Sequence, residues 1–157
     1  EPTQNIRSLG VKLKLSSTKT LVKNKSIILI DDSLVRGTTC HKIVKMLYEG
    51  GAKEVHVRIA CPEIKFPDFY GVDMPTKEEL LAHKKNNQEM CDYIKAKSLK
   101  FLSISGLYSA LTNQKRDNNY PQFSDHYFTG DYPIKPTDAQ KELNVAQLSL
   151  LSSKSNN

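Results

Sequence analysis

The sequence predicts an α/β fold in which a mainly parallel sheet is flanked by helices. Two apolar strand patterns, at residues 27–30 and 54–60, are separated by a helical pattern that begins at Thr39. A strand, a helix and a strand within about 35 residues form a right-handed βαβ unit, whose two strands run parallel. A further strand is predicted at residues 99–104.

The first of these strands leads into the candidate active site. Residues 27–30 read Ile-Ile-Leu-Ile, a run without turn residues that is typical of a strand buried on both faces. Two carboxylates, Asp31 and Asp32, follow directly, and then a loop rich in hydroxyl and glycine residues leads into the helix. Open α/β sheets bind phosphate at such strand-to-helix connections, so we expect the site at residues 27–39.

Local signals place the other elements of the first half. Apolar residues alternate with lysines at 11–15, which indicates a half-exposed edge strand or an extended loop. Residues 21–26 are expected to form a lead-in turn. The helix after the loop has Thr39 as its expected N-cap, and the glycine pair at 50–51 ends it.

In the second half, prolines and aromatic residues at 61–75 indicate an ordered loop that can cover a ligand. Residues 76–79 have the spacing of a capping box and are expected to open a helix. Asparagines at 86–87 interrupt that helix before a second short one, and Ser105 is expected to start a helix after the strand at 99–104.

Composition divides the chain into two parts. Hydrophobic residues make up 38% of the 157 residues, and the shortfall from the globular average lies in the C-terminal third. We therefore expect a domain at residues 1–112 and an extended tail at 113–157, with roughly the last dozen residues disordered. An aromatic cluster at 127–133 is expected to pack on a partner surface.

Charge, hydropathy and cysteine use exclude several classes. The net charge of +6 comes from basic residues that are spread through the chain, which disfavours nucleic acid and suits an anionic small substrate. No apolar run approaches the roughly 20 residues that span a bilayer, and no leader pattern opens the chain, so we expect no membrane partner. Three cysteines far apart indicate neither zinc nor disulfides, but a reduced, cytoplasmic setting.

The chemistry of the loop indicates the ligand. Asp31 and Asp32 are suited to bind a vicinal diol or to hold Mg²⁺ through water. The loop offers backbone N–H groups at 35–39, which suit a phosphate monoester. Three hydroxyls add to these donors, those of Ser33, Thr38 and Thr39. A ligand that carries a diol near one phosphate is a ribose 5-phosphate.

Simpler interpretations stand beside these. Asp31 and Asp32 could be solvated acids at a strand-end turn, although the loop that follows disfavours this. Arg36 is equally well explained by phosphate contact or by a surface ion pair. Thr39 could cap the helix and bind phosphate at once, since both use the same helix end. Cys40 is expected to be a buried apolar filler and not a nucleophile.

Residues 27–39 resemble the phosphoribosyl pyrophosphate (PRPP) signature of type I phosphoribosyltransferases. Four other segments narrow the resemblance to the glutamine amidophosphoribosyltransferase family: 11–15, 51–58, 69–76 and 128–133. The segment at 69–76 is specific to this branch. The likeness extends over residues 2–133, which correspond to the C-terminal part of the family's transferase domain.

The resemblance implies a partial type I phosphoribosyltransferase fold and a role in de novo purine synthesis. The family transfers ammonia from glutamine to PRPP and releases pyrophosphate. The acids matching Asp31 and Asp32 contact Mg²⁺ and the ribose hydroxyls there, and residues matching 7–14 belong to a loop that closes over PRPP. The implied PRPP-binding residues are Asp31, Asp32, Ser33, Val35, Arg36, Gly37, Thr38 and Thr39.

The sequence also departs from the family pattern. The glutaminase domain and the pyrophosphate-binding segment are absent, so we assign no catalytic residue and expect an inactive fragment. Some members hold an iron–sulfur cluster through cysteines near the equivalents of Asp68, Ser124 and Tyr127, none of which is cysteine here, so we expect no cluster. The resemblance further implies a homo-oligomeric parent enzyme, with purine nucleotides as additional candidate ligands.

Two other functions stay open. The chain could be a non-catalytic PRPP- or nucleotide-binding module, either a remnant of the enzyme or a regulator. It could also be another type I transferase, which the segment at 69–76 and the tail disfavour. In either case a sheet cut after its first strands leaves an open apolar edge, from which we expect marginal stability.

Overall fold

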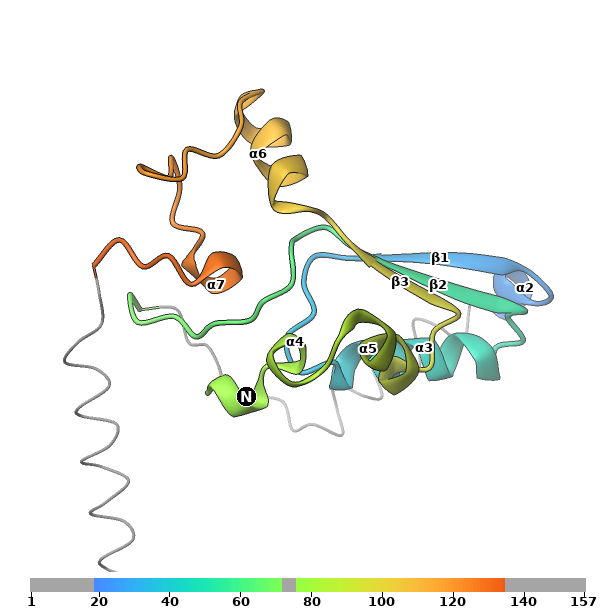
Figure 1. The fold of residues 1–157 in the computed structure, drawn as a ribbon. Helices are drawn as coiled ribbons and strands as arrows, with labels where there is room; N and C mark the ends of the chain where they lie inside the picture. Colours follow the sequence, from blue (N-terminus) through green and yellow to red (C-terminus); the bar gives the residue numbers. More distant parts are fainter. Residues whose placement is uncertain (1–18, 72–75, 135–157) are drawn as a thin grey trace, which may run out of the picture.

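The computed structural model describes residues 19–71 and 76–134 (Figure 1). The predicted segment at 11–15, the loop at 7–14 and the end of the tail lie outside the described residues. The elements, in order, are α2 (Lys19–Val22), β1 (Ser26–Asp31), α3 (Thr38–Glu49), β2 (Glu54–Ile59), the 3₁₀ helix η1 (Lys77–Glu79), α4 (Leu81–Lys84), α5 (Asn87–Ile94), β3 (Ser98–Phe101), α6 (Ile104–Thr112) and α7 (His126–Thr129).

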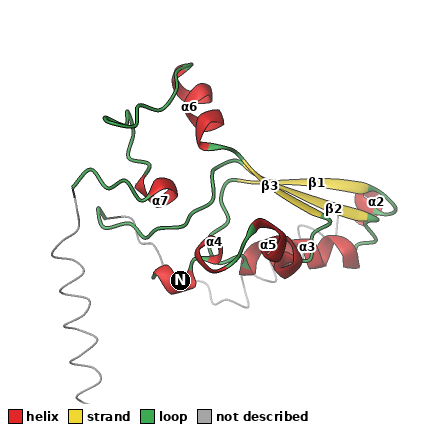
Figure 2. Cartoon of the chain, in the orientation of Figure 1, coloured by secondary structure: helices red, strands yellow, loops and turns green. Residues whose placement is uncertain are grey.

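The three strands form one parallel sheet in the order β1-β2-β3. The register pairs Ser26 with Glu54 and Asp31 with Ile59, so the carboxyl ends of β1 and β2 lie side by side. The crossovers place α3, α4 and α5 along one face of the sheet (Figure 2). The prediction of a mainly parallel sheet flanked by helices is therefore confirmed.

The hydrophobic core lies between this face of the sheet and the helices. Strand β2 alternates strictly, with Val55, Val57 and Ile59 buried and the residues between them half-buried. Helices α3 and α5 cover these side chains, and Val44 and Ile94 are fully buried. Because each fully buried aliphatic side chain contributes about 1.5–3 kcal/mol, this single layer holds the described fold together.

The opposite face of the sheet is open. On β1, Ile28 is 65% exposed and Ile30 is 72% exposed, and no described helix covers them. The prediction that residues 27–30 are buried on both faces is therefore wrong. β1 is an edge strand of the described sheet, and its neighbours on this face are half-buried polar residues of β2, His56 and Arg58.

Several helix starts differ from the prediction. Helix α3 begins at Thr38 with Gly37 as its N-cap, so Thr39 is not the cap. Thr76 makes no capping hydrogen bond, and the residues after it form η1 instead of an α-helix. The capping box occurs ten residues later, where Asn86 and Glu89 bond reciprocally. The expected lead-in turn at 21–26 is partly helical, since α2 ends at residue 22.

The last predicted strand and helix are present, with shifted bounds. Strand β3 ends at Phe101 instead of residue 104. Helix α6 begins at Ile104 because the Ser103 side chain accepts a hydrogen bond from the backbone N–H of Gly106. A cap at Ser103 ends the extended chain earlier than the apolar pattern alone indicates.

The described part of the aromatic cluster of the tail packs on the chain itself. Tyr132 Oη donates to the carbonyl of Pro67 at 2.9 Å, and Tyr70 Oη donates to the carbonyl of Ile134 at 2.6 Å. The backbone N–H of Lys65 donates to the carbonyl of Tyr127. These bonds hold the segment around α7 against the loop that follows β2.

Within residues 19–71 and 76–134, none of the helices is long and apolar enough to cross a bilayer.

Two isoleucine substitutions test the one-sided core. Ile94→Ala removes a fully buried side chain, and we expect it to lower the free energy of unfolding by about 2–5 kcal/mol. Ile30→Ala makes the same chemical change on the open face, where we expect a loss of no more than about 0.5 kcal/mol. Urea unfolding followed by circular dichroism measures both, and equal losses would contradict the described packing.

Candidate functional site

The candidate site lies at the carboxyl end of β1. Asp31 is the last residue of the strand, and its carbonyl accepts a hydrogen bond from the backbone N–H of Ala60 at 2.9 Å. This bond extends the pairing of β1 with β2 to the point where the chain leaves the sheet. Since the chain then enters α3 at Thr38, the acidic residues and the N-terminus of a helix share one edge of the fold.

Residues 31–40 line a pocket of about 310 Å³, at the lower end of the range for small-molecule sites. The pocket brings together all eight residues that the sequence predicts to bind PRPP: Asp31, Asp32, Ser33, Val35, Arg36, Gly37, Thr38 and Thr39. Leu34 is 2% exposed and anchors the loop in the core. The loop is therefore attached to the fold at its middle as well as at its ends.

The two carboxylates lie at the rim of this pocket. The backbone N–H of Asp32 donates to Asp31 Oδ1, and Ser33 Oγ donates to Asp32 Oδ1, both at 3.1 Å. The Asp32 residue is exposed, and Asp31 is half-buried. Paired carboxylates with solvent access fit Mg²⁺, which binds one or two protein carboxylates and completes its shell with water and substrate oxygens.

The described residues include no group of three or more histidine, cysteine, aspartate or glutamate side chains placed to hold a metal ion.

The N-terminus of α3 is open toward the pocket. Gly37 occupies the N-cap position in a left-handed conformation, with φ +75°, and has no side chain that could cap the helix. The backbone N–H groups of the first helical turn have no acceptor within the helix. Together with the helix dipole, they favour an anion at this point.

A second set of contacts holds the loop from the outside. The backbone N–H of Leu81 donates to the carbonyl of Val35 at 2.9 Å, and Arg36 Nη2 donates to Glu79 Oε2 at 2.9 Å. Gly37 lies so close to this segment that a Cβ there would be 2.7 Å from Leu81 Cδ2 and 3.0 Å from Tyr93 Cε1. The start of α4 and the side of α5 therefore form a wall behind the loop.

Arg36 makes the surface ion pair that was one of its two expected roles. Its side chain is 54% exposed and that of Glu79 is 50% exposed. The residue nevertheless lines the pocket with the rest of the loop. The sequence did not reveal that Glu79, Leu81 and Tyr93 support the loop. The one signal was Gly37, because a glycine can indicate that another segment lies close to the backbone, but it does not identify that segment.

The two thiols near the acids are not nucleophiles. Cys40 is 2% exposed, and burial followed by the charge of Asp31 raises the pKa of its thiol to about 11. Burial and the charge of Asp32 raise the pKa of the Cys61 thiol to about 11 as well. Both thiols therefore stay protonated at neutral pH, and the interpretation of Cys40 as a buried filler is confirmed.

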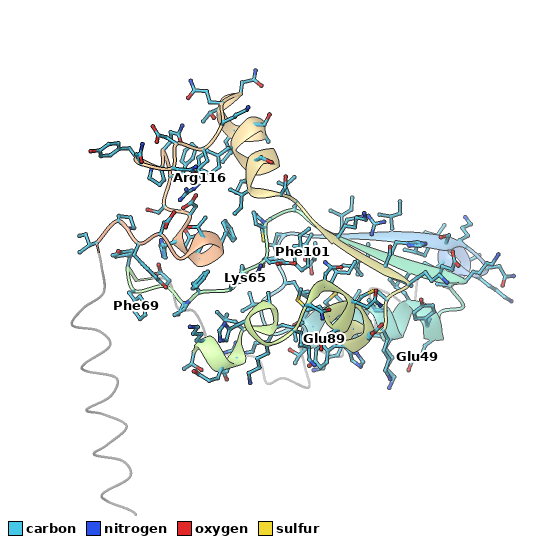
Figure 3. The ribbon with its side chains drawn as sticks, viewed as in Figure 1. Glu49, Lys65, Phe69, Glu89, Phe101 and Arg116 are labelled. Carbon is cyan, nitrogen blue, oxygen red and sulfur yellow. The ribbon has the colours of Figure 1, made fainter. Side chains whose placement is uncertain are left out.

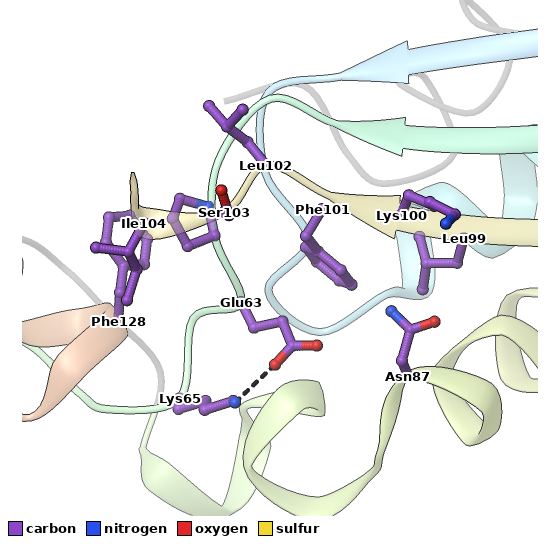
Figure 4. A pocket seen from close by; sticks show the side chains of 11 residues that line it. Glu63, Lys65, Asn87, Leu99, Lys100, Phe101, Leu102, Ser103, Ile104 and Phe128 are labelled. Atoms are coloured by element: carbon purple, nitrogen blue, oxygen red, sulfur yellow. Dashed lines mark ion pairs between the residues drawn. The ribbon is translucent and has the colours of Figure 1, made fainter. Parts of the chain in front are cut away.

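A second pocket, of about 440 Å³, lies between the end of β3 and α7 (Figure 4). Its wall includes Phe101, Phe128 and Asn87, together with an ion pair of 2.6 Å between Lys65 and Glu63. This pocket could not be predicted from the sequence, because its walls come from four separate parts of the chain.

The three positions that the family resemblance relates to cluster ligands also come together. Asp68, Ser124 and Tyr127 line one cavity of about 310 Å³ with His126. His126 Nε2 lies 2.5 Å from Asp68 Oδ1, and the two side chains are 2% and 1% exposed. A buried histidine–aspartate contact thus joins the loop after β2 to the segment around α7.

The same segment contains a buried ionic network around Arg116, which Figure 3 places between α6 and α7. Arg116 contacts Asp125 and Asp131, each at 2.6 Å, and Tyr108 Oη donates to Asp125 at 2.8 Å. Burial acts to raise the pKa of Asp125, but the hydrogen bonds from Arg116, Tyr108 and Thr129 outweigh it and lower that pKa. Asp125 is therefore ionised and satisfied within the fold.

Comparison with known proteins gives consistent matches. No family model matches the chain. The amidophosphoribosyltransferase of Rhizobium etli is 53% identical over 154 residues, which are 98% of this chain and 31% of that protein. The amidophosphoribosyltransferase of Staphylococcus aureus is 50% identical over 133 residues, which are 85% of this chain and 27% of that protein.

Solved structures agree with these sequences. Glutamine PRPP amidotransferase from B. subtilis, complexed with ADP and GMP, superposes with a TM-score of 0.66 at 40% identity, over 85% of this chain and 29% of that one. An allosteric regulatory enzyme of purine biosynthesis superposes with a TM-score of 0.67 at 39% identity, over 87% of this chain and 30% of that one.

The parallel sheet, the acidic strand end and the loop before α3 define a type I phosphoribosyltransferase fold. More specifically, the chain is a homologue of the amidophosphoribosyltransferases and matches the C-terminal part of their phosphoribosyltransferase domain. The resemblance seen in the sequence motifs is thereby confirmed. The chain spans about 30% of the length of these relatives.

Substitution of the loop glycine tests the wall behind the loop. We expect Gly37→Ala to destabilise the fold by more than about 1–2 kcal/mol, because it adds a contact with Leu81 to the cost of a positive φ. Gly51→Ala is the matched control, since its φ is +92° but its Cβ would meet only Lys23, at the ordinary van der Waals distances of 3.4 Å from Cγ and 3.6 Å from Cα. Denaturant unfolding of both variants measures the difference, and a smaller loss at residue 37 would overturn the described contact.

Proposed function

We propose that the chain is the C-terminal part of an amidophosphoribosyltransferase and that its pocket binds the ribose 5-phosphate moiety of PRPP. The complete enzyme would transfer ammonia from glutamine to PRPP, giving 5-phosphoribosylamine and pyrophosphate in de novo purine synthesis. The observation that supports this most strongly is the position of Asp31 and Asp32 in one pocket with the uncapped N-terminus of α3.

Each end of the pocket suits one end of this ligand. The carboxylates of Asp31 and Asp32 accept hydrogen bonds from the two ribose hydroxyls, and charge-assisted bonds of this kind are among the stronger ones. The 5-phosphate would occupy the open end of α3, where the backbone N–H groups of the first helical turn can donate to it, and Thr38 and Thr39 line the same pocket with their hydroxyl groups. The fixed spacing between acids and helix end then selects a sugar phosphate over free phosphate.

The same acids would hold Mg²⁺. Two carboxylates leave most of the coordination shell of this ion to water and to ligand oxygens, as its chemistry requires. When bound, the ion would neutralise charge that builds up on the departing pyrophosphate. Asp31 and Asp32 thus orient the ribose and supply the negative charge that attracts the ion, while neither exchanges a proton with the substrate.

The exposed face of β1 supports the proposal that this chain works within a longer polypeptide. Ile28 and Ile30 form an apolar surface beside the site, and burying them against another layer of the fold would stabilise it. The relatives are about three times as long as this chain. The pyrophosphate-binding segment and the ammonia source would come from the remainder of such a protein.

The proposal also includes additional ligands, the cellular compartment and the oligomeric state of the enzyme. A relative has been solved with ADP and GMP, which supports purine nucleotides as additional ligands. The three cysteines are unpaired, which fits a reducing cytoplasm. Family resemblance supports a homo-oligomeric parent enzyme.

A non-catalytic PRPP-binding module is the second candidate. The open face of the sheet is compatible with it as well, because a remnant of the enzyme would keep the ribose 5-phosphate pocket while lacking the rest of the transferase domain. Both functions predict that this chain binds ribose 5-phosphate and does not release pyrophosphate by itself. Turnover by the complete polypeptide that contains this chain would separate them, because only the enzyme provides a complete active site.

Binding of ribose 5-phosphate tests the assigned sugar contact. In the presence of Mg²⁺, we expect Asp32→Ala to weaken the affinity of the 157-residue chain about 10- to 100-fold, the loss that corresponds to charge-assisted hydrogen bonds. Asp92→Ala removes an exposed carboxylate on α5 outside the pocket and serves as the matched control. Isothermal titration calorimetry measures all three proteins, and an unchanged affinity for Asp32→Ala would refute the contact.

Turnover by the chain alone is a separate prediction. We expect no pyrophosphate release from PRPP when ammonium is the nitrogen donor, because the resemblance finds no match in this sequence for the family's pyrophosphate-binding segment. A coupled pyrophosphate assay measures this, with a full-length amidophosphoribosyltransferase as the positive control. Release above the rate of a protein-free blank would show that the chain is catalytically complete.

A further inference from the structure

Arg36 is the one cation among the described residues that line the pocket at 31–40. A dianionic phosphate in this pocket would therefore find its strongest charged partner in Arg36. In the structure, however, this guanidinium is bonded to a carboxylate from another element, Glu79 of η1.

We propose that Glu79 is a positioning residue that competes with the ligand phosphate for Arg36. In the free site Glu79 holds the guanidinium beside the loop, and on binding the phosphate takes its place. This rests on the proposed function, because it assumes a phosphate at the N-terminus of α3. It assigns to Glu79 a role that the sequence pattern does not indicate.

Glu79 is held in place independently of its ion pair. It lies two residues before Leu81, whose backbone N–H donates to the carbonyl of Val35, the neighbour of Arg36. The other neighbour of Arg36, Gly37, lies so close to Leu81 and Tyr93 that no Cβ fits between them. The segment that carries Glu79 is thus held beside Arg36 by a backbone hydrogen bond at Val35 and by the close approach at Gly37.

The ion pair between Arg36 and Glu79 is weak enough for a bound phosphate to replace Glu79. Both side chains are about half exposed, and exposed ion pairs contribute little to stability. Only Nη2 contacts Glu79, whereas a guanidinium carries five donors in a planar fork that matches phosphate oxygens. A bound phosphate can therefore offer Arg36 more and stronger bonds than Glu79 does.

Competition and a purely structural role predict different changes in phosphate affinity when Glu79 loses its charge. If Glu79 only supported the loop, removing its charge would weaken phosphate binding or leave it unchanged. If it competes, removing its charge frees Arg36 and tightens binding. Since exposed ion pairs contribute at most about 1 kcal/mol, the gain in affinity should not exceed about fivefold.

The test is a double-mutant cycle in the 157-residue chain, with ribose 5-phosphate and inorganic phosphate as probes in calorimetry. We expect Glu79→Gln to tighten binding of both probes about two- to fivefold. Glu78→Gln removes the neighbouring exposed charge on η1, which makes no ion pair with Arg36, and should change the affinity by less than that. In an Arg36→Ala background, which binds phosphate more weakly, Glu79→Gln should have no effect.

The outcomes separate this inference from the proposed function. If Glu79→Gln binds ribose 5-phosphate no more tightly than the wild type while Asp32→Ala still weakens binding, the role of Glu79 is overturned and the pocket assignment stands. An equal gain from Glu78→Gln would overturn it too, because the effect would then be general charge. Should Glu79→Gln fold poorly, Glu79→Asp shortens the side chain and should tighten binding to a smaller extent. Absence of binding by the wild type and Glu79→Gln alike would overturn both proposals.

Discussion

Parallel pairing of β1 with β2 is the constraint from which the site follows. Two parallel strands can be joined only by a crossover, and here the crossover is α3. The chain must therefore leave β1, turn, and start a helix at the same edge where the strands end. Asp31 and the N-terminus of α3 are neighbours for this reason, and the negative and positive ends of the pocket are a consequence of topology rather than of the loop alone.

The crossovers also decide which side of the loop is supported. Both place their helices on one face, so η1, α4 and α5 lie behind the loop and contact three consecutive residues, Val35, Arg36 and Gly37. The loop is thus held on its inner side by the core and left open toward the ligand. A site held in this way needs little reordering when a phosphate binds, which preserves affinity.

The site could be predicted from the sequence because its signals are local. Acids at a strand end, a glycine and hydroxyl residues before a helix lie within nine consecutive positions, and the structure gathers them as expected. The exposure of Ile28 and Ile30 could not be predicted, since an apolar strand looks the same whether or not a second layer covers it. Glu79 was missed because its contact with Arg36 spans 43 positions and leaves no periodic pattern.

The described part of the C-terminal segment is held by contacts that composition does not reveal. Few aliphatic residues indicated a tail, yet the described part of it is held by aromatic contacts and by buried charges instead. Asp125 is 3% exposed and is satisfied by Arg116 and Tyr108, and the contact between His126 and Asp68 ties the segment to the loop after β2. The ionic network around Arg116 depends on this pairing, because an unpaired buried charge is costly. The loop that leaves β2 beside the pocket is therefore fixed at its far end by residues more than 50 positions away, which links the polar C-terminal segment to the geometry of the site.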